Sequence, residues 1–268
     1  MYLQKNETHS LHRPKRKKFP RRKIMTHYPG QIVQSDLIDM QQFSRVNSGF
    51  NYILVVIDCF SKFLWCIPLR TKTAKDTGSG LRSIFNSMKF PVQTIIFDQG
   101  LEYVNSVVQN LLKERGVYSY HILTKTKASS AERVIKTIKH IIWKIFTHNK
   151  NNRWIDILED LTINYNNTYH KSIKMKPIEV TWENRKKVFK TLYPKKSFKV
   201  HCRLNKGDKV RIALNKNIFD KGFTQNWGKE IFEIVKVFQK HGVCWYRLKD
   251  KDGNIYSKQK YFEQLNQV

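Results

Sequence analysis

The order of apolar and polar residues divides the middle of the chain into short strands followed by helices. Three runs rich in Ile, Val, Leu and aromatic residues, separated by turn-forming residues, predict hairpin-linked strands at Ile32–Met40, Tyr52–Asp58 and Phe63–Leu69. Beyond them, the pattern predicts a helix at Ala74–Met88, a buried strand at Gln93–Phe97, a helix at Asn105–Arg115 that ends at Gly116, and a strand at Tyr118–Leu123.

The most regular helical pattern runs from Ala128 to His148, where the apolar residues recur on one helix face. Ser129 or Ser130 could cap this helix, and Glu132, Lys136, Lys139 and Trp143 form a stripe beside the apolar face. A second amphipathic helix contains Trp154 and Tyr165, and Pro177 opens a short third one. Three hairpin strands followed by alternating helices and strands predict an α/β fold, a mixed sheet covered by helices.

The last part of the chain has a different pattern. Residues 205–268 predict short strands at Lys209–Leu214, Glu230–Phe238, Trp245–Leu248 and Ile255–Ser257, with turns between them. This pattern predicts a small all-β, SH3-like or chromo-like barrel. Its surplus of Lys and its aromatic residues fit binding to a DNA backbone, while core packing or a methyl-lysine cage are the alternatives for the rings, which are Phe223, Trp227, Trp245 and Tyr246.

The composition of the chain indicates what kind of partner it binds. The 268 residues include 50 Lys and Arg against 21 Asp and Glu, a formal net charge of +29, and 40% of them are hydrophobic. That apolar share is enough for a core and excludes wholesale disorder. No apolar run approaches the ~18 residues of a membrane span, so no membrane partner is expected. A charge this positive indicates a polyanion partner, most simply nucleic acid.

The positive charge is concentrated at the two ends. Residues 1–24 hold nine basic side chains against one acidic, residues 25–184 hold 20 against 13, and residues 185–268 hold 21 against 7. We therefore expect a basic extended arm over 1–24, a core over 25–184, a basic linker over 185–204 and the barrel over 205–268. The side chains expected to contact DNA there are Arg16, Lys17, Lys18, Arg21, Arg22, Lys195, Lys196 and Lys199.

The arm has other interpretations. Its basic run could act as a nuclear import signal, which favours a nuclear protein, or it could be a solvated tail. The four cysteines, Cys59, Cys66, Cys202 and Cys244, contain no CxxC pair. That spacing argues against both a disulfide scaffold and a zinc ribbon, so no zinc is expected.

Three acidic residues fall where the predicted elements could bring them together. Asp36 lies in the first strand, Asp98 directly follows the strand Gln93–Phe97, and Glu132 lies in the first turn of the long helix. Converging carboxylates repel one another unless a cation joins them, and hard oxygen ligands suit Mg²⁺ or Mn²⁺. Two such ions about 3.5–4 Å apart could clamp the attacking and leaving oxygens of a phosphodiester.

Each acid also has an ordinary interpretation. Asp39 shares the strand of Asp36 but points to the other face, so register decides between them. Asp98 could simply begin a turn, and Glu132 could merely favour the positive end of its helix. Asp58 is assigned to the turn that precedes the third strand.

Four motifs in order resemble the core of retroviral-type integrases, which have a ribonuclease-H-like fold: Asp36, the run Tyr52–Lys62, the run Asp98–Tyr103 and the run Glu132–Lys139. The basic arm and the tail segments 223–227 and 230–234 look most like integrases of Maverick/Polinton DNA transposons. Val33 stands where that family often has Trp, and Phe97 stands where Ser or Thr is usual. The family's amino-terminal His-His-Cys-Cys zinc module has no counterpart in these residues.

The resemblance implies a polynucleotidyl transferase whose catalytic, metal-binding acids are Asp36, Asp98 and Glu132. Its implied activity is metal-dependent trimming of an element's 3′ end and transfer of that end into target DNA. Lys136 and Lys139 would contact the element end, although a solvated face is the alternative. The implied partners are element and target DNA and further copies of the chain, and a chromatin partner stays open. The rival functions are a decayed or domesticated integrase that only binds DNA or chromatin, and a ribonuclease-H-type nuclease.

Overall fold

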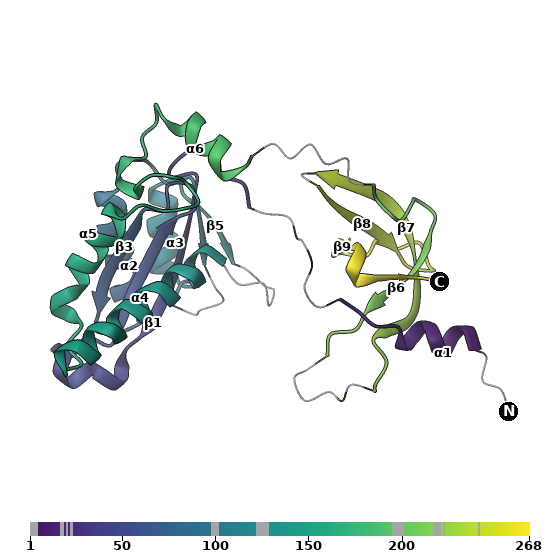
Figure 1. Cartoon of the computed structure of the whole chain (residues 1–268), viewed down its shortest axis with the longest axis horizontal. Helices are drawn as coiled ribbons and strands as arrows, with labels where there is room; N and C mark the ends of the chain where they lie inside the picture. The colour runs from purple at the N-terminus through teal and green to yellow at the C-terminus, as the bar shows by residue number, and fades with distance from the viewer. Residues whose placement is uncertain are drawn as a thin grey trace. The chain divides into compact units, whose positions relative to one another are not determined.

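The predicted hairpin strands form one side of a mixed sheet (Figure 1). The computed structural model describes the chain except for residues 1–4, 17–18, 20, 22–23, 98–101, 122–128, 195–200, 217–220, 222 and 241. Within the described residues the sheet has the order β3-β2-β1-β4-β5. Its strands are β1 (Ile32–Asp39), β2 (Tyr52–Asp58), β3 (Leu64–Leu69), β4 (Thr94–Phe97) and β5 (Tyr118–His121). The first three are antiparallel, and β4 and β5 run parallel to β1.

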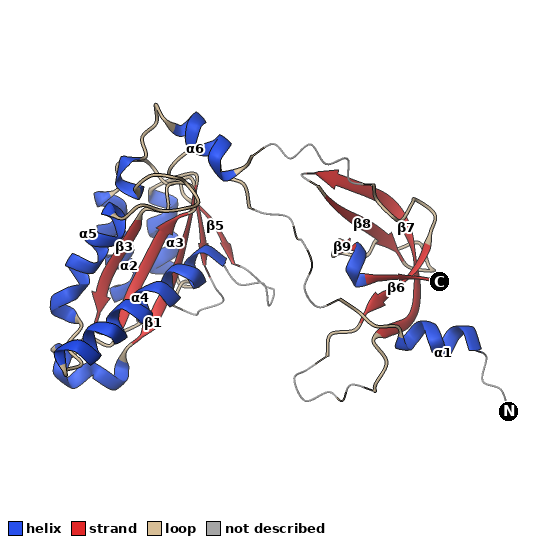
Figure 2. Ribbon diagram, viewed as in Figure 1, coloured by secondary structure: helices blue, strands red, loops and turns tan. Residues whose placement is uncertain are grey.

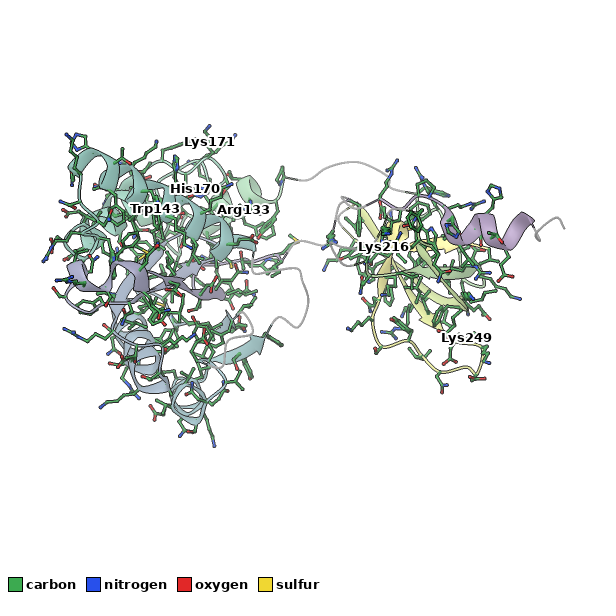
Figure 3. The ribbon with its side chains drawn as sticks, turned by 90° about the horizontal axis from the view of Figure 1, so that it is seen from below. Arg133, Trp143, His170, Lys171, Lys216 and Lys249 are labelled. Atoms are coloured by element: carbon green, nitrogen blue, oxygen red, sulfur yellow. A yellow bond between two sulfur atoms is a disulfide. The ribbon has the colours of Figure 1, made fainter. Side chains whose placement is uncertain are left out.

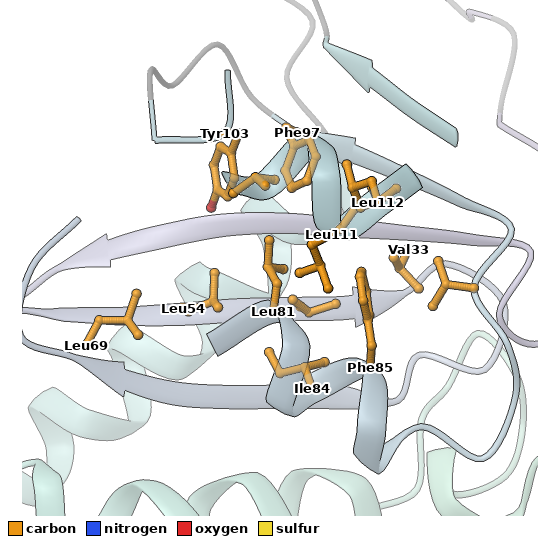
Figure 4. Close-up of a cluster of buried hydrophobic side chains, with 14 of the residues drawn as sticks. Val33, Leu54, Leu69, Leu81, Ile84, Phe85, Phe97, Tyr103, Leu111 and Leu112 are labelled. Carbon is orange, nitrogen blue, oxygen red and sulfur yellow. The ribbon is translucent and has the colours of Figure 1, made fainter. Parts of the chain in front are cut away.

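Helices cover both faces of this sheet (Figure 2). On one face pack α2 (Ala74–Ser87) and α3 (Ser106–Glu114), whose apolar side chains join those of the strands in a buried cluster (Figure 4). On the other face pack α4 (Ser129–Asn149) and α5 (Leu158–Asn167) around a second cluster. The predicted mixed sheet covered by helices, a ribonuclease-H-like arrangement, is confirmed. None of the helices within the described part of the chain is long and apolar enough to cross a membrane.

Local signals in the sequence explain several element ends. Thr73 caps α2 by accepting a hydrogen bond from the amide of Asp76, and Asn105 caps α3 by accepting one from Val108. Gly116, at a φ of 65°, follows α3 as predicted. Gly80 lets α2 approach the sheet closely, because a Cβ there would lie 2.9 Å from Leu54 Cδ2.

The predicted linker over 185–204 is wrong for its first half. Residues Arg185–Leu192 form the helix α6, because Val188 and Leu192 recur at helical spacing on an otherwise basic segment. Val188 is fully buried against Phe60 and Ile173. The compact α/β unit therefore spans Met25–Pro194.

Residues Met1–Ile24 and Lys195–Val268 form a second compact unit, the small β unit. Its described strands make an antiparallel sheet of order β10-β6-β7-β8-β9, which fits the predicted SH3-like fold. The strands are β6 (Lys209–Ala213), β7 (Trp227–Lys240), β8 (Val243–Lys249), β9 (Lys260–Tyr261) and β10 (Leu265–Gln267). The predicted strand Ile255–Ser257 is wrong, because Ile255 makes only an isolated bridge to Lys249.

The predicted extended arm is wrong over Lys5–His12, which forms the helix α1. Buried Arg211 donates a hydrogen bond to Glu7, and Asn266 donates one to the carbonyl of Ser10, so α1 is fixed to the small β unit. The arm prediction rested on the basic run after residue 12 and overlooked that the residues before it carry few charges.

The sequence argument against disulfides overlooked one pair. Cys202 and Cys244 form a disulfide within the small β unit, with their Cα atoms 5.7 Å apart. The two residues are separated by 42 positions, so their pairing depends on the fold and leaves no short spacing motif.

Candidate active site

Asp36 lies on the face of the sheet that α4 covers. Side chains alternate along β1, and Gln34 and Ile38 both contact α4: Ile38 joins its apolar cluster, and the Gln34 side-chain carbonyl accepts a hydrogen bond of 3.0 Å from the amide of Ala131. Asp36 stands between them and is half-buried, with Oδ1 accepting a 2.8 Å hydrogen bond from the amide of Leu37.

Asp39 has a different environment. It is exposed at the end of β1, and its carboxylate accepts hydrogen bonds of 3.0 and 2.9 Å from the amide and side chain of Gln41, which begins the short 3-10 helix η1 (Gln41–Asn47). By alternation its side chain belongs to the opposite face from Asp36. Of these two aspartates, only Asp36 is therefore on the face of α4.

Glu132 is exposed in the first turn of α4, next to the buried Ala131. The hydrogen bond between Gln34 and Ala131 therefore fixes this turn to β1 two residues before Asp36. Nothing in the sequence marks Gln34 as important, because a single polar residue in a strand is common. Only the register of β1 against α4 reveals its position.

The third predicted acid, Asp98, lies outside the described residues. Strand β4 ends at Phe97, which pairs with Ser35 of β1. The described residues contain no group of three His, Cys, Asp or Glu side chains placed to hold a metal ion. The donor chemistry of the two described acids fits Mg²⁺ or Mn²⁺, because both offer carboxylate oxygens.

The two residues that depart from the family pattern lie on the opposite face. Val33 and Phe97 are fully buried in the α2 and α3 cluster (Figure 4). The Phe97 ring stacks on Tyr103, with centroids 4.3 Å apart, and the Tyr103 hydroxyl lies 3.3 Å from that of Ser35. Both residues therefore contribute to core packing on the face opposite Asp36.

A group of basic side chains that the sequence analysis missed lies near the start of α4. Lys62, in the turn between β2 and β3, has a left-handed φ of 65° and donates a 2.5 Å hydrogen bond from Nζ to the carbonyl of Cys59. Burial lowers the pKa of Lys62, and the nearby charge of Arg133 on α4 lowers it further. Burial and the charge of Lys62 also lower the pKa of His170. Arg133 and His170 are labelled in Figure 3.

The turn that holds Lys62 is formed as predicted around Asp58. The buried Asp58 carboxylate accepts hydrogen bonds from the amides of Phe60 and Ser61 and from the Ser61 hydroxyl. Burial raises the pKa of Asp58 despite these donors. Phe60 packs on Ile173, which brings the loop of His170 to the same turn. The basic group, Lys62 with Arg133 and His170, thus comes from three segments distant in sequence.

The predicted DNA-contacting side chains are only partly within the described residues. Lys136 and Lys139 are exposed on α4, and Arg16 and Arg21 are exposed in the small β unit. Outside the described residues lie Lys17, Lys18, Arg22, Lys195, Lys196 and Lys199. Among the four aromatic residues singled out in the barrel, Trp227, Trp245 and Tyr246 are buried, so core packing explains them, and Phe223 is 74% exposed.

Comparisons with known proteins agree with the arrangement of the α/β unit. Residues 26–127 match the family model of the integrase core domain. A transposon-derived protein of Caenorhabditis elegans is 31% identical over 193 residues, which are 72% of this chain and 65% of that protein. The Pro-Pol polyprotein of simian foamy virus type 1 is 26% identical over 136 residues, 49% of this chain and 11% of the polyprotein.

A solved structure shares the fold. The simian T-cell lymphotropic virus intasome, in complex with the PP2A regulatory subunit B56 gamma, contains a chain that matches 97% of this chain and 86% of its own length, with a TM-score of 0.66 and 13% identity. The present chain spans less than two thirds of the length of each curated relative above. Its residues 26–127 are thus similar to the integrase core domain, and the chain is similar to a transposon-derived protein and to a retroviral polyprotein.

Proposed function

We propose that this chain is a transposon-encoded integrase that trims the 3′ end of its element and joins that end to target DNA. One observation carries the proposal: the hydrogen bond from Ala131 to Gln34 holds the first turn of α4, and with it Glu132, on the β1 face that bears Asp36. The match to the integrase core domain and the net charge of +29 support a DNA substrate. We also propose that the element that encodes it is a Maverick/Polinton DNA transposon.

The proposed metal ligands are Asp36, Glu132 and Asp98. Two Mg²⁺ or Mn²⁺ ions bound there would activate the attacking oxygen and stabilise the leaving oxygen in an in-line displacement. In the first step, water attacks a phosphodiester and the bond to the 3′ oxygen breaks, so the trimmed strand gains a 3′ hydroxyl and the released piece carries the 5′ phosphate. In the second, that hydroxyl attacks a target phosphodiester, so one P–O bond forms as another breaks and no nucleoside triphosphate is consumed.

The other residues of this face bind and orient the DNA. Lys136 and Lys139 are exposed on α4 beyond Glu132, where their ammonium groups can contact phosphates. Within the basic group, Lys62 and Arg133 add positive charge beside the first turn of α4, and His170 lies near Lys62. Gln34 touches no substrate and acts through its bond to Ala131, which positions Glu132.

The test compares three variants of the full chain. Asp36→Asn and Glu132→Gln should each lower Mn²⁺-dependent nicking and joining of a labelled DNA end by about three orders of magnitude, because several kcal/mol of metal stabilisation is lost. Asp39→Asn is the matched control, on the other face of the same strand, and should keep its activity. Equal activity in Asp36→Asn and wild type would disprove the metal site.

The alternative is a domesticated DNA- or chromatin-binding protein, which the charge alone also supports. DNA affinity should fall by about 10³–10⁵ between 50 and 200 mM salt if six to ten phosphates are contacted. Salt-dependent binding without joining in either metal would favour this alternative. We further propose that the chain works as a homo-oligomer in the nucleus, which light scattering on DNA ends and imaging of the tagged chain would test.

A further inference from the structure

Two tyrosines are exposed on the edge strand of the sheet. Tyr118 is 68% exposed and Tyr120 is 63% exposed, and both belong to β5, which pairs only with β4 within the described residues. They are the two most exposed aromatic side chains in the described part of the α/β unit. In contrast, Phe97 and Tyr103 are almost completely buried in the same unit.

The strand register shows which face these tyrosines occupy. Ile96 of β4 pairs with Gln34 of β1 on one side and with Tyr120 of β5 on the other, so the three side chains form one row across the sheet. Ser119, between the tyrosines, pairs with Ile95, which belongs to the opposite cluster. Tyr118 and Tyr120 therefore share the face of Gln34 and Asp36.

This row brings Tyr120 close to the candidate active site. Neighbouring strands lie about 4.8 Å apart, so the Tyr120 Cα is roughly 10 Å from that of Gln34, two residues before Asp36. Helix α4 packs mainly against β1 and β2, and α3 packs against β5 from the other face.

The spacing and the surroundings of the rings suggest their ligand. Residues two apart in a strand are about 6.6–6.8 Å apart, which is close to twice the ~3.4 Å separation of stacked bases. Stacking on aromatic side chains is how proteins hold unpaired bases irrespective of sequence. The exposed cations that share the stripe of Glu132 on α4, Lys136 and Lys139, supply charge complementary to the phosphates that accompany such a base.

We propose that Tyr118 and Tyr120 form a stacking platform that holds an unpaired base of the DNA end next to the acids Asp36 and Glu132. The platform rests on the proposed function, since it deepens the account of how the DNA end is held. Separating the terminal base pair exposes the strand to be trimmed, and the platform recovers part of the stacking free energy that this separation costs.

The test measures the affinity of the full chain for two duplexes that differ only in whether the last two pairs are mismatched. Wild type should prefer the unpaired end by about 5- to 150-fold, the effect of stacking one base. The double variant Tyr118→Ser/Tyr120→Ser should lose that preference. Tyr118→Phe/Tyr120→Phe should keep it, because stacking needs the ring and not the hydroxyl. Trp182→Ser, which removes another exposed ring of the unit, should also keep it.

Three outcomes would overturn the platform: no preference in wild type, a preference that survives the serine variant, or a serine variant that changes only the oligomeric state, which would make the edge a protein interface. The test is independent of catalysis, because Asp36→Asn should retain the preference while losing joining. A wild-type chain that discriminates unpaired ends but never joins them would disprove the proposed function and leave the platform intact.

Discussion

The two faces of the sheet in the α/β unit are built for different purposes. The α2 and α3 face, the closed face, is apolar almost throughout, and its largest fully buried side chains are Tyr103 and Phe97. The α4 face, the open face, carries Gln34 and Asp36 between apolar residues and leaves the β5 tyrosines exposed. A strand that alternates sides can thus supply stability on one face and polar chemistry on the other.

This difference also explains where the chain departs from the integrase pattern. Val33 and Phe97 both contribute to the closed face, where any well-packed apolar side chain maintains stability. Asp36 and Glu132 occupy the open face, where a change of residue type would remove one of the proposed oxygen ligands. Divergence at Val33 and Phe97 therefore carries little information about catalysis.

The largest effect is expected on the closed face. Phe97→Ala should destabilise the α/β unit by about 3–5 kcal/mol, because it removes a fully buried ring that stacks on Tyr103. The melting temperature should fall by roughly 2–4 °C for each kcal/mol, as measured by calorimetry of the full chain. Thr94→Ala, in the same strand but on the other face, should change it far less. Equal losses in the two variants would contradict the contrast between the faces.

Apolar periodicity was sufficient to predict the five strands of the α/β unit, its helices α2 to α5 and the mixed sheet. It failed where charge masked a short apolar stripe, as in α6, where Val188 and Leu192 stand among lysines. It also failed at α1, whose position depends on partners two hundred residues away, such as Arg211. Charge predicts solvent exposure on average, but one or two apolar residues at helical spacing are enough to dock a basic helix.

The candidate site could be predicted only in part, for a different reason. Residue type and spacing identify Asp36 and Glu132, and strand alternation separates Asp36 from Asp39 once the register is known. Gln34 has no sequence signature, because its role comes from its hydrogen bond with Ala131 of α4. Tyr120 has none either, because its position comes from the row that it shares with Ile96 and Gln34 across three strands. Lys62 and His170 likewise meet only through packing of Phe60 on Ile173.

The open face should respond to loss of a hydrogen bond with loss of activity. Gln34→Leu keeps the side-chain size but leaves the amide of Ala131 without its acceptor, so the first turn of α4 should loosen. We expect strand transfer to fall by about 10- to 100-fold, the usual effect of removing a partner that orients a metal ligand. A higher Mn²⁺ concentration at half-maximal activity than in wild type would show that the effect passes through Glu132.

Ser35→Ala is the control for this experiment. Ser35 follows Gln34 in β1, and its hydroxyl lies 3.3 Å from that of Tyr103 on the closed face. It should lower the melting temperature slightly and leave the Mn²⁺ response unchanged. A Gln34→Leu variant with the same Mn²⁺ response as wild type would show that this bond does not position Glu132.

A smaller effect is expected from the surface charges of α4. Log affinity falls as log salt concentration rises, and Lys136→Gln/Lys139→Gln should make this fall less steep. The magnitude of the slope should decrease by about two, one unit for each phosphate that is no longer neutralised. Lys75→Gln/Lys113→Gln removes the same charge from exposed positions on α2 and α3 and should leave the slope nearly unchanged. Equal slopes in both variants would show that DNA does not distinguish the two faces.

The smallest effect is a pH dependence of stability from His170. Its pKa lies below the ordinary 6.5 because burial and then the charge of Lys62 disfavour the protonated form. The unfolded chain therefore binds a proton more readily, so the stability contributed by neutral His170 is complete above pH 6.5 and is lost as the pH falls below it. The burial-raised pKa of Asp58 acts in the opposite direction, so the comparison must be between variants at each pH.

His170→Gln should flatten the decrease in melting temperature between about pH 6.5 and 5, whereas His140→Gln, which changes an exposed histidine of α4, should reproduce the wild-type slope. Parallel slopes in His170→Gln and wild type would mean that the protonated ring is tolerated beside Lys62.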